Sequence, residues 1–134
     1  MSNLITTELL KKWTDAIKNG DPKQVTDLYH EDAILLGTFS NKERTGHELI
    51  LEYFENLLKS PVEVEIVSNH PVFEQIEDDD EDDEKGVSCA ANSGLYNFVT
   101  GGKTINARFS FVYMNTEFDG WKIISHHSSV LPET

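Results

Sequence analysis

The sequence of 134 residues is poor in cysteine, in basic side chains and in long apolar runs. Its single cysteine, Cys89, excludes an internal disulfide and fits a reducing compartment. The 11 Lys and Arg stand against 24 Asp and Glu, and the net charge of −13 argues against nucleic acid or an anionic membrane as a partner. No apolar run approaches the roughly 20 residues of a membrane span, and the N-terminus lacks the features of a signal peptide. We therefore expect a soluble, cytoplasmic protein.

The acidity is concentrated in one uninterrupted run from Glu77 to Glu84. A calcium-binding loop of the EF-hand type needs spaced ligands and a central glycine, and this run has neither. We interpret the run as a solvated loop inserted at about residues 77–85. The chain length fits a single domain, so we expect one domain over residues 1–134.

The spacing of apolar residues predicts helices first and long strands afterwards. Helices are expected at about residues 6–19, with Thr6 or Thr7 as the cap, then at 21–29 and at 45–58. The last of these opens with a capping box, Thr45 followed three residues later by an acid. A period of two then predicts strands, at 33–38, 62–67, 72–76, 86–91, 94–99, 105–113 and 121–127. This order favours an α+β fold, with N-terminal helices packed in a strongly curved antiparallel sheet.

The last predicted strand carries two histidines and two serines in a row. Successive side chains of a strand point to opposite faces, so His126 and Ser128 share one face while His127 and Ser129 share the other. Lys122 belongs to the first set and suggests that this face meets solvent or a partner subunit. We therefore expect His127 and Ser129 to face the cavity. The alternative is that both histidines are hydrogen-bonded structural residues.

The histidines do not form a metal-binding pattern. Neighbouring strand residues point apart and cannot chelate one ion together. A zinc site needs three or four convergent ligands, and the spacing of His30, His47 and His70 does not bring them together. We expect no metal and no other cofactor.

Several segments resemble the nuclear-transport-factor-2-like superfamily; they are 20–22, 28–29, 32–36, 53–58 and 120–123. Residues 53–58 also resemble the association domain of calcium/calmodulin-dependent kinase II. The ending His-His-Ser-Ser-Val-Leu-Pro at 126–132, with residues 37–45 and 106–113, resembles the iota-class carbonic anhydrases. Leu131 stands where methionine is commoner in that class, a conservative exchange.

The resemblance implies reversible hydration of CO2 to bicarbonate in a polar-lined cavity of a cone-shaped fold. It places Thr38 and Tyr53 as hydroxyl donors around the substrate, although each residue could instead serve packing. With them we assign His127, as proton acceptor, and Ser129 to the catalytic set. Second-rank substrate-binding candidates are Ser128, His126, Arg44, Tyr96 and Arg108. The class has metal-dependent and metal-free members, and this sequence resembles the metal-free kind. We expect a homodimer, which would cover the apolar outer face of the sheet.

Two alternatives stay open. The first is an isomerase or cyclase on the same fold, which would need a buried carboxylate base. The polar face of the predicted strands carries Glu63, Glu65 and Glu74, and Asp32 precedes the first strand. No carboxylate is therefore clearly inward. The second is a non-catalytic module for oligomerisation or small-ligand binding, which a cavity plugged by side chains would favour.

Overall fold

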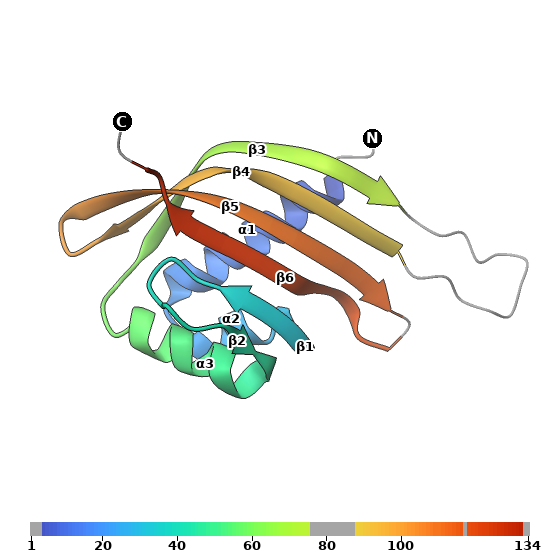
Figure 1. The fold of residues 1–134 in the computed structure, drawn as a ribbon, viewed down its shortest axis with the longest axis horizontal. Helices are drawn as coiled ribbons and strands as arrows, with labels where there is room; N and C mark the ends of the chain where they lie inside the picture. Colours follow the sequence, from blue (N-terminus) through green and yellow to red (C-terminus); the bar gives the residue numbers. More distant parts are fainter. Residues whose placement is uncertain (1–3, 76–87, 117, 133–134) are drawn as a thin grey trace, which may run out of the picture.

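A curved six-stranded sheet holds a long helix against its inner face (Figure 1). This computed structural model describes residues 4–75, 88–116 and 118–132, so the predicted acidic loop at 77–85 lies outside the described residues. The helices are α1 (Leu4–Asn19), α2 (Pro22–Thr26) and α3 (Gly46–Leu57). The strands are β1 (Tyr29–Leu36), β2 (Arg44–Thr45), β3 (Glu63–Gln75), β4 (Ser88–Thr100), β5 (Lys103–Thr116) and β6 (Gly120–Val130). The predicted α+β class is confirmed.

The sheet is mostly an antiparallel meander. Its strand order is β2-β1-β6-β5-β4-β3, and β3 to β6 pair with their neighbours along the chain. Gly101 and Gly102 adopt positive φ values of 59° and 76°, the left-handed conformations that a tight hairpin turn between β4 and β5 requires. The exception is β1, which runs parallel to β6. This pairing places the end of β1 beside the predicted catalytic residues of β6.

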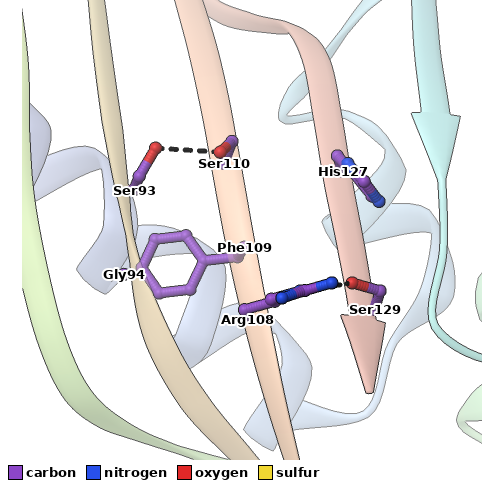
Figure 2. A pocket seen from close by; sticks show the side chains of 7 residues that line it. All are labelled: Ser93, Gly94, Arg108, Phe109, Ser110, His127 and Ser129. Atoms are coloured by element: carbon purple, nitrogen blue, oxygen red, sulfur yellow. Dashed lines mark hydrogen bonds between the residues drawn. The ribbon is translucent and has the colours of Figure 1, made fainter. Parts of the chain in front are cut away.

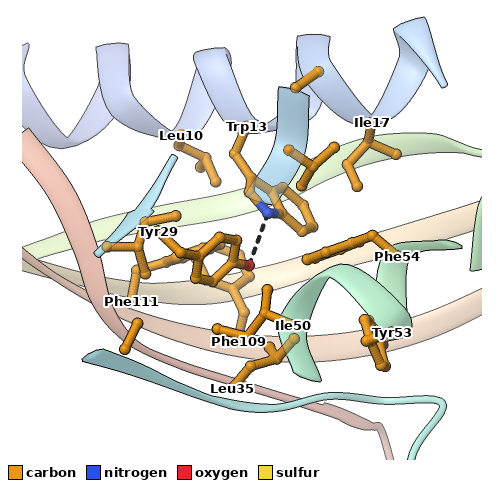
Figure 3. Close-up of a cluster of buried hydrophobic side chains, with 14 of the residues drawn as sticks. Leu10, Trp13, Ile17, Tyr29, Leu35, Ile50, Tyr53, Phe54, Phe109 and Phe111 are labelled. Atoms are coloured by element: carbon orange, nitrogen blue, oxygen red, sulfur yellow. Dashed lines mark hydrogen bonds between the residues drawn. The ribbon is translucent and has the colours of Figure 1, made fainter. Parts of the chain in front are cut away.

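Aromatic side chains fill the space between α1 and the sheet. Along β5, Phe109, Phe111 and Tyr113 are buried on the inner face, which confirms the predicted alternation. Trp13 of α1 stacks on Tyr96 of β4 with ring centroids 5.7 Å apart. Trp13 and Phe111 meet in an edge-to-face geometry with ring centroids 5.4 Å apart (Figure 3). Buried aromatic pairs in these geometries stabilise the fold beyond the area that they bury. The inner face is therefore a packed aromatic core.

Only some of the helix caps predicted from the sequence are found in the structure. Asp21 caps α2 as predicted, because its side chain accepts a hydrogen bond of 3.0 Å from the Lys23 backbone N–H. The helix α1 begins at Leu4, so the caps predicted at Thr6 or Thr7 are wrong. Thr45 occupies the cap position of α3, but among the described residues its side chain makes no cap hydrogen bond.

Strand β6 contains a bulge at Ile124. Val112 of β5 pairs with Ser125, and the next residue, Tyr113, pairs with Ile123. Ile124 is therefore an extra residue with no position opposite it on β5. An extra residue changes the phase of the alternation, so residues before and after a bulge swap faces.

Candidate active site

The bulge turns His126 and Ser128 inward. Their side chains are 3% and 4% exposed, whereas His127 is exposed and Ser129 is half-buried on the outer face. The predicted orientation of the two pairs is therefore wrong. The prediction extended strict alternation from Lys122, and that alternation does not continue across the bulge.

Both ring nitrogens of His126 are engaged by tyrosine hydroxyls. Nδ1 lies 2.7 Å from the Tyr29 Oη, and Nε2 lies 3.1 Å from the Tyr96 Oη. The indole N–H of Trp13 donates to the same Tyr29 oxygen at 3.1 Å (Figure 3). The imidazole also stacks on Phe111, with ring centroids 3.9 Å apart. Every polar atom of this buried ring therefore has a partner.

The hydrogen bonds of Tyr96 determine which ring nitrogen of His126 carries the hydrogen. The Tyr96 hydroxyl donates its only hydrogen to Ser128 Oγ at 2.6 Å, so toward His126 its oxygen must accept. Nε2 therefore carries the hydrogen. Burial lowers the pKa of His126 to about 3, with the charge of His127 a smaller cause, so the ring is neutral at pH 7. Nδ1 is then an acceptor, and it takes the hydrogen of Tyr29.

The hydrogen-bonded chain ends at Thr38. Leu35 of β1 lies opposite His126, so the residues just after β1 run beside Ser128. The hydroxyls of Thr38 and Ser128 are directly hydrogen-bonded. A hydroxyl oxygen has two lone pairs, so Ser128 can accept from Tyr96 and still either donate to Thr38 or accept from it. In both cases one of the two hydroxyl hydrogens of Thr38 and Ser128 is left to meet a bound group.

Tyr53 of α3 lies next to this end of the chain. Its ring packs against Gly37, where an added Cβ would lie 2.5 Å from two ring carbons. Its hydroxyl accepts a hydrogen bond of 3.3 Å from the Phe39 backbone N–H. Burial raises the pKa of Tyr53 to about 12, so the phenol stays protonated at neutral pH and keeps a hydrogen to donate. Arg44 adds a buried cation, with its Cζ 6.0 Å from the centre of the Tyr53 ring.

The remaining predicted residues meet on the opposite side of the sheet. Figure 2 shows Arg108 pointing at Ser129, and its Nε donates to Ser129 Oγ at 3.2 Å. They border an open groove of about 360 Å³, lined by Ser93, Gly94, Arg108, Phe109, Ser110, His127 and Ser129. The structure thus divides the predicted set. An inner group holds Thr38, Arg44, Tyr53, Tyr96, His126 and Ser128, and an outer group holds Arg108, His127 and Ser129.

A second polar cluster lies on the inner face around Ala90. Glu74 of β3 and Tyr113 of β5 both pair with Ala90, and Asn92 follows two residues later on the same face. Glu74 Oε2 accepts from the Thr6 N–H at 3.4 Å. Within the described parts of the chain, Glu74 Oε1, Asn92 Oδ1 and the Tyr113 hydroxyl are buried without a hydrogen-bond partner.

The expectation that no carboxylate is inward is therefore wrong for Glu74, although Glu63 and Glu65 are exposed as predicted. Strand β3 has two shifts of register, between Ile66 and Ser68 and between Pro71 and Phe73, and together they return Glu74 to the face of Val64. The prediction placed Glu74 on the polar face because of its charge. Among the described residues, no three His, Cys, Asp or Glu side chains are placed to hold a metal ion. The predicted absence of a cofactor stays a prediction.

The curved sheet wrapped around one helix defines the nuclear-transport-factor-2-like fold. The chain is similar to an NTF2-like protein from Pseudomonas putida KT2440, with 14% identity, 96% and 86% of the two chains covered and a TM-score of 0.72. It is also similar to a ketosteroid isomerase-like protein from Erwinia carotovora atroseptica, with 10% identity, 95% and 94% covered and a TM-score of 0.65. At these identities the likeness concerns the fold alone.

Within this fold, the chain belongs to the calcium/calmodulin dependent protein kinase II association domain family, whose model matches residues 5–132. A structure of such a domain from Xanthomonas campestris is 34% identical, with 96% and 87% of the two chains covered and a TM-score of 0.78. The predicted superfamily is confirmed, and the iota-class carbonic anhydrase resemblance stays a prediction. The comparison with curated proteins gives no match. In the described part of the chain, no helix is long and apolar enough to cross a membrane.

Proposed function

We propose that the chain catalyses the reversible hydration of CO2 to bicarbonate at the inner hydroxyl cluster of Thr38, Tyr53 and Ser128. The observation that carries this proposal is the direct hydrogen bond between Thr38 and Ser128 at the end of a buried chain of fixed donors. Preorganised donors of this kind stabilise charge that develops during a reaction, because they need not reorient when it appears.

The chemistry that we propose is an addition of water to CO2. The water oxygen attacks the carbon, a C–O bond forms, and the electron pair of one C=O bond moves onto its oxygen. Tyr53 and the hydrogen-bonded pair of Thr38 and Ser128 donate hydrogen bonds to that oxygen, since Tyr53 and the pair each keep a hydroxyl hydrogen that the described contacts do not use. The hydrogen bond from Tyr96 holds the Ser128 hydroxyl in place.

The proton released by the water must leave without His127, which lies on the outer face. His126 is closer but cannot hold a proton at neutral pH, because burial lowers its pKa to about 3. We therefore assign the proton to solvent water or buffer, and His126 to the positioning of Tyr96 and, through it, Ser128. Hydroxyl donors without a strong base predict modest turnover.

A stopped-flow CO2-hydration assay on chelator-treated protein tests the proposal. Ser128→Ala should lower the rate by roughly 10²-fold, the usual loss when one such donor is removed. Ser129→Ala is the matched control, because the neighbouring serine lies on the outer face and should leave the rate unchanged. An inactive parent protein, or equal rates in the two variants, would refute a carbonic anhydrase site here.

A second candidate function, isomerisation by proton transfer, is favoured by the cluster around Ala90. A carboxylate with one buried, unpartnered oxygen and a nearby tyrosine hydroxyl are the base and the oxyanion donor that such chemistry needs. Glu74→Gln separates the candidates. It should leave CO2 hydration unchanged, whereas loss of hydration in that variant would contradict the first assignment.

The family match to an association domain supports the predicted homodimer. We assign its interface to the outer face of the sheet, where Leu36 and Phe73 are 39% and 45% exposed. A monomer in sedimentation velocity would refute this assignment.

A further inference from the structure

A second pocket, of about 370 Å³, opens beside Tyr53 on the side of α3. It is lined by Phe39, Arg44, Tyr53, Asn56, Leu57, Ser60 and Thr100. Its volume falls within the range of small-molecule sites, roughly 300–1,000 Å³. The lining combines two apolar side chains with one guanidinium and several neutral hydrogen-bonding groups. This composition is typical of a site that orients a small amphiphilic ligand by one charged end.

Arg44 is the charged group of this pocket, and its side chain is only 7% exposed. An arginine has five N–H donors. Nε donates to Ser40 Oγ at 3.3 Å, and Nη1 donates to the Leu49 carbonyl at 3.2 Å and to Glu52 Oε1 at 2.5 Å. Within the described residues no acceptor holds Nη2, so two donors of a nearly buried guanidinium are left for the pocket.

Glu52 does not satisfy the charge of Arg44. Its side chain is 54% exposed and contacts Nη1 alone, and an ion pair with one partner in water contributes little. The pair instead holds the guanidinium in place, together with the Leu49 carbonyl. A carboxylate that meets Nη2 would accept charge-assisted hydrogen bonds from the two donors that remain.

We propose that this pocket binds a small organic monocarboxylate. The carboxylate accepts from Nη2 of Arg44 and from the Tyr53 hydroxyl, and the apolar part of the ligand lies against Phe39 and Leu57. A dianion such as phosphate fits less well. Only one guanidinium would attract it, whereas Glu52 and the net charge of −13 would repel it. The site shares the Tyr53 hydroxyl with the hydroxyl cluster, so a bound carboxylate takes the hydrogen that Tyr53 would give to CO2, but carboxylate binding does not require that the cluster hydrates CO2.

Isothermal titration of the full chain tests the proposal, with sodium butyrate as the probe. Butyramide is the neutral isostere and should bind at least ten-fold more weakly, because it lacks the charge that Nη2 recognises. Inorganic phosphate should also bind more weakly than butyrate. Equal affinities for butyrate and butyramide, or no butyrate binding at millimolar concentration, would overturn the carboxylate site.

Two substitutions locate the site. Arg44→Lys keeps the charge but loses the two Nη2 donors that face the pocket, and it should weaken butyrate binding by ten-fold or more. Because Arg44 also supports local structure, Ser60→Asp provides an independent test that leaves the guanidinium in place and adds a like charge at the rim. Ser110→Asp, on the outer face, is its matched control. Weaker butyrate binding in Ser60→Asp alone supports the site, and equal effects of the two serine substitutions would overturn it.

Discussion

The buried imidazole of His126 makes the stability of the fold depend on pH. Its pKa falls from an ordinary value near 6.5 to about 3 in the folded chain, because burial removes the water that solvates the charged ring. The unfolded chain therefore binds this proton first as the pH falls. Unfolding stability is then lost progressively below pH 6.5 and continues to fall until the folded pKa is reached.

The magnitude follows from the window between the two pKa values. Each pH unit in that window costs about 1.4 kcal/mol of unfolding free energy. His126 alone should therefore lower the free energy of unfolding by about 2 kcal/mol between pH 7.5 and pH 5.0. Against a typical total of about 5–15 kcal/mol, this is a large share.

Urea unfolding at the two pH values measures the effect in the parent protein and in two variants. His126→Gln cannot be protonated, so its loss of stability between pH 7.5 and 5.0 should be smaller than the parent's by about 2 kcal/mol. Ser129→Ala, on the outer face, should keep the parent's pH dependence, because it removes no titratable group. Equal pH dependence in the parent and in His126→Gln would refute the assignment of a buried, neutral imidazole.

Two further substitutions test the geometry around the site. Gly37→Ala places a Cβ 2.5 Å from the Tyr53 ring, whereas ordinary carbon contacts are about 3.5–4.0 Å. We expect the ring to shift by about 1 Å and CO2 hydration to become slower. An unchanged hydration rate would contradict the role of Tyr53. Deleting Ile124 removes the extra residue of β6. His126 should then stay protected from diethyl pyrocarbonate, because Ile123 and Ser125 become neighbours and keep their pairing with Tyr113 and Val112; reaction as fast as that of His127 would contradict the assigned register.

Much of the fold follows from local sequence. The alternation of β5 is regular, so the predicted period of two matches the burial pattern of this strand. The Asp-Pro pair at residues 21–22 and the Gly-Gly pair at 101–102 mark a helix start and a hairpin turn for clear backbone reasons. Capping by Thr45 was a weaker inference, because whether a side chain bonds the first turn depends on the path of the chain before it.

Of the four predicted catalytic residues, Thr38 and Tyr53 lie on the inner side of the sheet, and His127 and Ser129 lie on the outer side. Thr38 and Tyr53 lie together, and Tyr96, His126 and Ser128 of the second-rank set belong to the same hydrogen-bonded chain. The roles of Trp13 and Tyr29 were not foreseen. They come from α1 and β1, far from β6 in sequence, and nothing local indicates that their polar atoms reach one imidazole.

The bulge in β6 explains why strand alternation was insufficient. Ile124 is an ordinary β-branched residue, so its sequence carries no glycine or proline that would mark an irregular strand. The signal lies in the pairing with β1 instead: Tyr29 lies opposite Ile123, and the next paired residue, Ile34, lies opposite Ser125. Both strands are therefore irregular at the place where the Tyr29 hydroxyl reaches His126. A bulge that re-aims a side chain is a recurrent feature beside active sites, and here it decides which of two adjacent His-Ser pairs faces the core.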